Sequence, residues 1–370
     1  MHQIKITTLI ILFALLGVSC DINMTVNERP NIVYILADDL GYGDLSCYNI
    51  SSKIYTPNID QLADDSICFT NAHSSASVCT PTRYGLMTGR YCWRTSRKSG
   101  VIWAWEKPLL KKERLTLPEM LKEKGYITGL IGKWHLGINW ITTDGKNPGI
   151  ETKGENIDYK SPIVNGPLNH GYDCYYGDDV PNFPPYAFIE NDSYLSIPTE
   201  MLPKNICGVP GVMAKGWKFE NVLPALTQKA EEFIIRNKQR PFFLFVSITA
   251  PHEPIAPNKE FIGTSKAGRD GDFVQEVDAR IRSILKTLEK EGLTENTLVI
   301  FSSDNGSSFQ DGMPDEDSKK YKSKRGIILN YGHNPSKNFR GMKADAWEGG
   351  HRIPYIKYPG KSKGDKSRIS

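Results

Sequence analysis

Two pairs of adjacent side chains in this sequence offer oxygen ligands for a metal ion, Asp38-Asp39 and Asp304-Asn305. Carboxylate and amide oxygens, without sulfur or imidazole, favour calcium or magnesium over zinc. Adjacent aspartates also repel each other strongly unless a cation lies between them. Taken singly, each pair could be a solvated turn or a helix cap. They predict a metal site only if the fold brings them together.

Chemically active residues follow each of four apolar runs, which are Asn31–Ala37, Tyr126–Ile131, Phe242–Thr249 and Leu298–Phe301. The residues that follow these runs are, in order, Asp38-Asp39, Lys133 and His135, His252, and Asp304-Asn305. Ligands of parallel α/β sheets bind beyond the carboxyl ends of the strands. Any one of these residues could be a loop residue without a role, but together they predict a single site.

The elements that must position these residues alternate along the chain. Continuous apolar runs are typical of strands buried on both faces. Helical patterns lie between them, at Asn58–Asp65, Leu117–Lys124, Val222–Asn237 and Phe273–Glu291. This alternation predicts an α/β fold with a large, mostly parallel sheet flanked by helices on both faces. Residues 139–216 are rich in Gly, Pro, Asn and Tyr, and we expect them to form long surface loops.

A cysteine lies in the segment Cys79-Thr80-Pro81-Thr82-Arg83, which continues to Thr88-Gly89-Arg90. Two further segments are Gly125–Gly137, GYITGLIGKWHLG, and Glu348–Pro354, EGGHRIP. Together they resemble the signatures of the formylglycine-dependent, arylsulfatase-like sulfatase family of the alkaline phosphatase superfamily. The resemblance extends from about residue 31 to residue 360. Without it, Cys79 would be read as a buried structural thiol.

The resemblance implies that Cys79 is oxidised to formylglycine by a formylglycine-generating or other sulfatase-maturing enzyme. As a geminal diol, this residue would attack sulfur with one hydroxyl and expel sulfate with the other. A covalent intermediate splits one hard step into two, and a free thiol offers no such exit. The implied activity is hydrolysis of sulfate esters, which makes the protein a sulfuric ester hydrolase.

The resemblance also implies roles for individual residues. One calcium ion would be held by Asp38, Asp39, Asp304, Asn305 and the modified Cys79. Pro81 suits an early helical position, which places Cys79 at a helix N-terminus.

The remaining implied catalytic residues are basic. Arg83 would hold the diol and the metal-bound carboxylates, and Lys133 and Lys343 would clamp the sulfate. His135 would act as the base that helps collapse the hemiacetal, and His252 would bind sulfate and protonate the leaving oxygen.

The substrate implied by the resemblance is a sulfated carbohydrate, because the segment around Tyr84 and Tyr91–Gly100 looks closest to exported bacterial sulfatases that act on glycans. A 6-O-sulfated galactose or N-acetylgalactosamine is the specific expectation. Nine residues in or near predicted loops could contact the sugar, although each also fits a structural role: Arg94, Arg97, Lys98, Trp103, Trp105, His170, Asp178, Asp179 and His333.

Residues 1–20 have the pattern of an export signal, with Lys5 before an apolar run, Leu9–Val18, and small residues at its end. Cys20 resembles the lipidated cysteine of a bacterial lipoprotein, although Gly17 replaces a usual larger aliphatic residue. We therefore expect an exported, periplasmic or cell-surface lipoprotein with a possible lipid anchor to the membrane. The alternative for Cys20 is an ordinary residue beside a cleavage site.

The seven cysteines contain no CxxC pair, and an extensive disulfide framework is not expected. The net charge of +4 and the lysine-rich stretches 319–324 and 361–366 do not indicate a nucleic-acid partner.

Residues 30–370 are expected to be a sulfatase catalytic domain truncated at its C-terminal end. The family implies a smaller C-terminal subdomain, and the sequence ends soon after the segment 352–360.

Two other functions remain open. One is a phosphatase or phosphodiesterase of the same superfamily, which would use Ser or Thr and zinc. The other is a non-catalytic, glycan-binding lipoprotein, which an unmodified Cys79 would produce.

Overall fold

The computed structural model describes residues 29–308, 326–360 and 368–369. The expected signal segment and both lysine-rich stretches lie outside the described residues. Ten described strands form one sheet. Their spatial order is β12 (Arg368–Ile369), β2 (Ile67–Phe69), β11 (Tyr355–Tyr358), β10 (Thr297–Ser303), β1 (Asn31–Asp38), β9 (Phe242–Pro251), β3 (Ile127–Gly132), β4 (Cys174–Gly177), β5 (Ile189–Glu190) and β6 (Ser193–Tyr194).

The sheet is mixed. Its five central strands, β10, β1, β9, β3 and β4, run parallel to one another. Beyond them, β11 pairs antiparallel with β10 and β2, and β5 pairs antiparallel with β4 and β6. At one edge β12 pairs parallel with β2. The expectation of a mostly parallel sheet is therefore right for the centre and wrong for β11, β5 and β6. The edge strands have two to four residues, too few to leave a periodic signal in the sequence.

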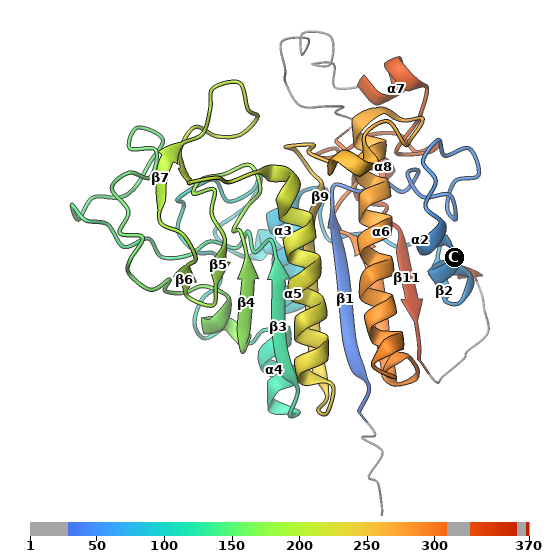
Figure 1. The fold of residues 1–370 in the computed structure, drawn as a ribbon, viewed down its shortest axis with the longest axis horizontal. Coiled ribbons are helices and arrows are strands. Elements are labelled where there is room, and N and C mark those ends of the chain that lie inside the picture. The colour runs from blue at the N-terminus through green and yellow to red at the C-terminus, as the bar shows by residue number, and fades with distance from the viewer. Residues whose placement is uncertain (1–28, 309–325, 361–367, 370) are drawn as a thin grey trace, which may run out of the picture.

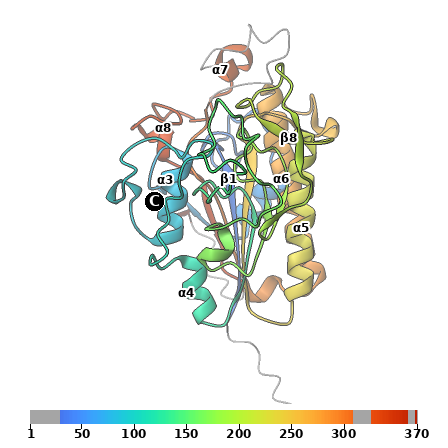
Figure 2. The same cartoon turned by 90° about the vertical axis from the view of Figure 1, so that its left-hand side faces the viewer.

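Helices cover both faces of the sheet, as predicted. On one face lie α2 (Pro57–Asp64), α5 (Val222–Asn237) and α6 (Gly268–Lys290), and on the other lie α3 (Cys79–Thr88) and α4 (Leu117–Glu123) (Figures 1 and 2). The side chains of β1 show why: Val33 and Ile35 join the core under α5 and α6, whereas Tyr34 and Leu36 pack with Met87 of α3. Burial on both faces explains the unbroken apolar run.

The segment 139–216 is less irregular than the sequence predicted. Besides β4 to β6 it contains a 3-10 helix, η2 (Pro167–His170), and a separate two-stranded sheet of β7 (Pro198–Met201) and β8 (Val212–Ala214). The other described elements are η1 (Cys92–Arg94), η3 (Phe219–Asn221), η4 (Lys259–Phe261), η5 (Thr294–Asn296), α7 (Gly326–Tyr331) and α8 (Glu348–His351). No helix among the described residues is long and apolar enough to cross a bilayer.

The carboxyl ends of β1 and β9 are offset by a break in their pairing. Leu36 lies opposite Ser247, but Asp38 lies opposite Pro251, so β9 carries two more residues than β1 over this stretch. Bulges of this kind redirect the side chains that follow them. Here the irregularity ends both strands at the same edge of the sheet, beside Asp39 and His252.

Candidate active site

The two oxygen-bearing pairs meet at the carboxyl edge of the sheet. Asp38 ends β1, and Asp304 follows β10, the strand beside it. The Asp39 amide donates to Asp304 Oδ1 at 3.2 Å, and Asn305 Nδ2 donates to Asp39 Oδ1 at 2.7 Å. All four side chains are buried. Asp39 has φ 65°, a left-handed conformation that is uncommon outside glycine and is often found at functional sites.

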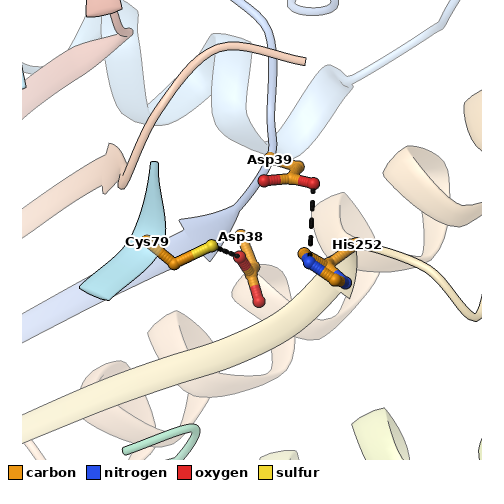
Figure 3. A group of neighbouring side chains, drawn as sticks. All are labelled: Asp38, Asp39, Cys79 and His252. Atoms are coloured by element: carbon orange, nitrogen blue, oxygen red, sulfur yellow. Dashed lines mark hydrogen bonds and ion pairs between the residues drawn. The ribbon is translucent and has the colours of Figure 1, made fainter. Parts of the chain in front are cut away.

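The donor atoms in this cluster fit a hard divalent cation. Ligand atoms of Asp38, Asp39, Cys79 and His252 all lie within 4.8 Å of one another (Figure 3). Asn305 Oδ1 is buried without a hydrogen-bond partner, so its lone pairs are free to bind an ion. Carboxylate and amide oxygens are the donors that calcium prefers. From the sequence, His252 was expected only to bind sulfate and protonate the leaving oxygen. In the structure, its side chain also lies beside Asp38 and Asp39.

The carboxylates in this cluster differ in acidity. Burial, together with the charge of Asp38, raises the pKa of Asp304 to about 7. Although burial favours protonation of Asp38, the charges of Lys133, His252 and Arg83 hold its pKa well below the usual range. A cation between these carboxylates would remove their mutual repulsion.

Cys79 is the first residue of α3 and is 1% exposed. Its Sγ lies 3.7 Å from Asp38 Oδ1 (Figure 3). Burial raises the pKa of the Cys79 thiol to about 12, so an unmodified thiol would stay protonated at neutral pH. The thiolate is the nucleophilic form of cysteine. The site is therefore not arranged to activate Cys79 as a simple thiol nucleophile.

Three cationic side chains surround the carboxylates. Arg83 Nη2 lies 2.8 Å from Asp304 Oδ2. Lys133 Nζ lies 2.7 Å from Asp38 Oδ2, and Lys343 Nζ lies 2.7 Å from Asp39 Oδ2. Arg83 and Lys133 are almost completely buried. Three positive charges thus face the three carboxylates, as a buried cluster requires if no charge is to remain unpaired.

The two histidines have defined proton positions, because a carbonyl oxygen can only accept a hydrogen bond. His135 Nε2 donates to the Ile102 carbonyl at 2.9 Å, which leaves Nδ1 without the proton and without a partner. His252 Nδ1 donates to the Glu253 carbonyl at 2.6 Å, which leaves Nε2 3.8 Å from Asp39 Oδ2.

Both rings are neutral at pH 7. Burial, together with the positive charge of Lys133, holds the pKa of His135 well below its usual range. Burial, together with the positive charge of Lys343, lowers the pKa of His252 to about 4. Each histidine therefore offers one free nitrogen lone pair. His135 also has φ 53°, a second left-handed residue in this cluster.

Two positioning residues were missed from the sequence. Ser247 Oγ accepts a hydrogen bond from Arg83 Nη1 and donates to the Lys133 carbonyl. Thr80 Oγ1 donates to the His135 carbonyl and accepts the Ile102 amide. Ser247 could have been suspected, since it interrupts the buried apolar run of β9. Thr80 gives no signal apart from its place beside Cys79.

The nine candidate sugar-binding residues separate by burial. Trp105, His170, Asp178 and His333 are buried. His170 bonds to Asn165, and His333 bonds to Asp44. These two histidines are therefore explained by internal contacts. Asp178 Oδ1 is buried without a partner, and burial raises the pKa of Asp178 to about 7.

The other candidates lie closer to solvent. Asp179 Oδ1 accepts the His135 amide, and Arg97 pairs with Glu106. Arg94 and Lys98 both contact Trp93. Trp103 is 59% exposed, which makes it the candidate aromatic side chain that a ligand could reach.

Comparisons with known proteins agree with this geometry. Residues 30–368 match the protein family described as Sulfatase. A curated N-acetylgalactosamine-6-O-sulfatase from Bacteroides thetaiotaomicron is 35% identical, over 92% of this chain and 70% of its own length. An arylsulfatase from Hemicentrotus pulcherrimus is 32% identical, over 89% of this chain and 53% of its own length.

A solved structure connected with glycosaminoglycan metabolism by Bacteroides thetaiotaomicron superposes with a TM-score of 0.77 and 32% identity. The match covers 90% of this chain and 72% of that chain. The chain spans about half to two thirds of most of the curated relatives that it matches. From the family match over nearly the whole chain and the shared fold, we conclude that this protein belongs to the sulfatase family.

Proposed function

We propose that the protein hydrolyses sulfate esters of sulfated carbohydrates, using a formylglycine formed from Cys79 and one calcium ion. The observation that carries this proposal is the position of Cys79. It opens α3 within a buried cluster of three carboxylates, three cations and two neutral histidines. Such a cluster is costly to bury unless its charges serve a ligand or a reaction.

The residues that would hold the calcium ion are Asp38, Asp39, Asp304, Asn305 and the modified Cys79. When present, formylglycine would supply the attacking oxygen, and calcium would make that oxygen more acidic and polarise the sulfate. Arg83 keeps Asp304 in place through its 2.8 Å ion pair. Because three cations already offset three carboxylates, a divalent ion would leave the site with an excess of two positive charges, which suits an anionic ester.

Proton transfers follow from the histidine tautomers. His135 Nδ1 is buried without a hydrogen-bond partner and would accept the proton released as sulfate is expelled. His252 Nε2 carries no proton in the free protein. A bound sulfate ester would favour the imidazolium form of His252 by its negative charge, and this form would donate its Nε2 proton, taken up from solvent, to the leaving oxygen. Lys133 and Lys343, which pair with Asp38 and Asp39, would stabilise charge on the sulfate oxygens.

For the substrate, we propose a 6-O-sulfated N-acetylgalactosamine or galactose unit. The support is the Bacteroides relative, which is an N-acetylgalactosamine-6-O-sulfatase at 35% identity. We also propose export as a lipoprotein, and maturation by a formylglycine-generating or other sulfatase-maturing enzyme. Residues 30–370 would form the catalytic domain.

The test is sulfate release, measured by ion chromatography, from a panel of defined sulfated sugars. The protein is produced with a sulfatase-maturing enzyme and assayed with calcium. We expect turnover of 6-O-sulfated N-acetylgalactosamine or galactose, and none by Cys79→Ala. Zinc-dependent hydrolysis of phosphate esters that survives Cys79→Ala would instead establish a phosphatase. Binding of sulfated sugars without any turnover by protein whose Cys79 is converted would establish a non-catalytic glycan-binding protein.

A further inference from the structure

Trp103 presents an exposed aromatic ring beside the candidate active site. The residue is 59% exposed, and its ring stacks on the ring of the buried Phe183, with centroids 5.3 Å apart and planes inclined by 24°. Phe183 covers one face of the indole, so the exposed area lies on the remainder of the ring. Exposed tryptophan is costly to hydrate and is often retained for binding.

Direct contacts connect this ring to the predicted base. Phe183 packs edge-on against His135, with centroids 5.9 Å apart. The residue before Trp103, Ile102, accepts a 2.9 Å hydrogen bond from His135 Nε2. Trp103 is thus one residue from a backbone group that fixes the histidine tautomer. The Phe183 ring contacts both the Trp103 ring and the His135 ring, so Trp103 is two ring contacts away from the predicted base.

The loop that carries Trp103 is held at both ends. The Ile102 amide donates to Thr80 Oγ1, next to Cys79, at 3.0 Å. The Trp103 amide donates to Glu106 Oε2 at 2.8 Å, and Glu106 is paired with Arg97. A fixed ring loses little conformational entropy when a ligand binds. This arrangement is preorganised for a flat partner.

The chemistry around the ring indicates the class of partner. The cluster of carboxylates and cations in the candidate active site would bind an anion. The Trp103 indole would pack against a flat, weakly apolar surface close to that anion. A pyranose carrying a sulfate ester has both features, because the C–H groups on one face of a sugar ring pack against aromatic faces. A single aromatic ring, without an apolar groove, is too small for an acyl chain.

We propose that Trp103 is the platform on which the pyranose ring of the sulfated substrate stacks. This proposal rests on the proposed function and adds a specificity-determining residue to it. Other exposed tryptophans lack the same connection: Trp93 stacks on Tyr91, and Arg340 lies over the Trp347 ring at 3.8 Å. Trp93 is 56% exposed, and it therefore serves as a matched control.

The test measures binding by calorimetry in a Cys79→Ala background with calcium, so that turnover does not enter. The probes are N-acetylgalactosamine 6-sulfate and inorganic sulfate. Trp103→Ala should weaken saccharide binding about tenfold, whereas its affinity for sulfate should stay within about twofold. Trp103→Phe should keep most of the saccharide affinity, and Trp93→Ala should keep all of it.

Three results would overturn the platform. If the background protein binds the saccharide and Trp103→Ala binds it equally well, the platform is wrong while the proposed function stands. If Trp103→Ala loses affinity for sulfate and saccharide to the same extent, the residue has a structural role. If the background protein binds sulfate but no saccharide, the proposed sugar substrate and the platform both fail.

Discussion

Ser247 orients two functional groups through a single hydroxyl. It accepts from Arg83 and donates to the Lys133 carbonyl, so it connects the arginine beside Asp304 to the end of β3, next to the lysine proposed to bind sulfate. A buried hydrogen bond to a charged group contributes about 1.5–3 kcal/mol. A change confined to this oxygen should therefore weaken the hold on the Arg83 side chain.

Ser247→Ala should lower kcat for sulfate-ester hydrolysis by about ten- to a hundredfold, because Arg83 would lose a partner in a water-excluded site. Steady-state kinetics with a 6-O-sulfated sugar measures this effect. The matched control is Ser302→Ala on β10, which is separated from β9 by β1 and whose hydroxyl donates to the Pro354 carbonyl. Equal turnover by Ser247→Ala and the parent protein would show that the serine has no positioning role.

At the scale of elements, the close approach of β3 and β9 depends on one glycine. Gly132 has φ 113°, and a Cβ built there would lie 1.9 Å from the Ser247 carbonyl oxygen. The next residue, Lys133, donates its amide to that same carbonyl at 2.8 Å. Glycine is needed here both for the backbone conformation and for the space.

Gly132→Ala should destabilise the protein by about 3 kcal/mol or more, because strain and steric overlap add. Chemical denaturation checks this value. Gly145 also has a positive φ, 69°, but has nothing within 4 Å of a built Cβ. Gly145→Ala should therefore cost only about 1 kcal/mol. Comparable losses in the two variants would mean that β3 and β9 are not in the contact described here.

Helices α2 and α6 are joined by a carboxylate that gives stability a defined pH dependence. Asp278 of α6 accepts the backbone amides of Asn58 and Ile59 at the start of α2. Burial raises the pKa of Asp278 to about 6. The native state therefore binds this proton more tightly than the unfolded chain does, and the contribution of Asp278 to stability falls as pH rises from about 4 to about 6.

Urea denaturation at pH 4.5 and pH 7 should show this dependence in the parent protein. Asp278→Asn should reduce the loss of unfolding free energy over that interval by at most about 3 kcal/mol. An unchanged pH slope in Asp278→Asn would show that another group binds the proton.

Much of the architecture was predictable, and the reasons differ by element. The central strands β1, β3, β9 and β10 and the helices α2, α4, α5 and α6 were predicted to within about five residues, because burial on one or two faces leaves a periodic or continuous apolar pattern. The fifth central strand, β4, was not predicted, since it lies in the segment expected to form loops. The antiparallel edges and β7 and β8 were not, because strands of two to four residues leave no periodic pattern in the sequence.

The predicted site residues gather at one edge of the sheet, but the sequence could not give their geometry. It could not reveal the left-handed backbone of Asp39 and His135 or the carbonyls that set the histidine tautomers. These features arise from contacts between segments far apart in the chain. The roles of the site residues stay predictions.

The whole molecule should be stabilised by calcium, since the proposed ligands come from β1, α3 and the end of β10. An ion that binds only the native state adds about 2.7 kcal/mol at a concentration a hundred times its Kd. We expect Tm, measured by differential scanning fluorimetry, to rise by several degrees with calcium. Asp38→Ala should lose this shift, whereas Asp64→Ala, an exposed carboxylate on α2, should keep it. A shift with zinc but not with calcium would contradict the proposed metal.

The most direct test of the proposed formylglycine nucleophile compares the conversion of Cys79 with the activity of the protein. Preparations made with increasing amounts of a sulfatase-maturing enzyme are analysed twice, by peptide mass spectrometry for the fraction of Cys79 present as formylglycine and by sulfate release from N-acetylgalactosamine 6-sulfate. We predict a rate of sulfate release that is proportional to the fraction of Cys79 converted to formylglycine and is zero when no Cys79 is converted. Sulfate release at the full rate from protein whose Cys79 is an unmodified thiol would contradict it.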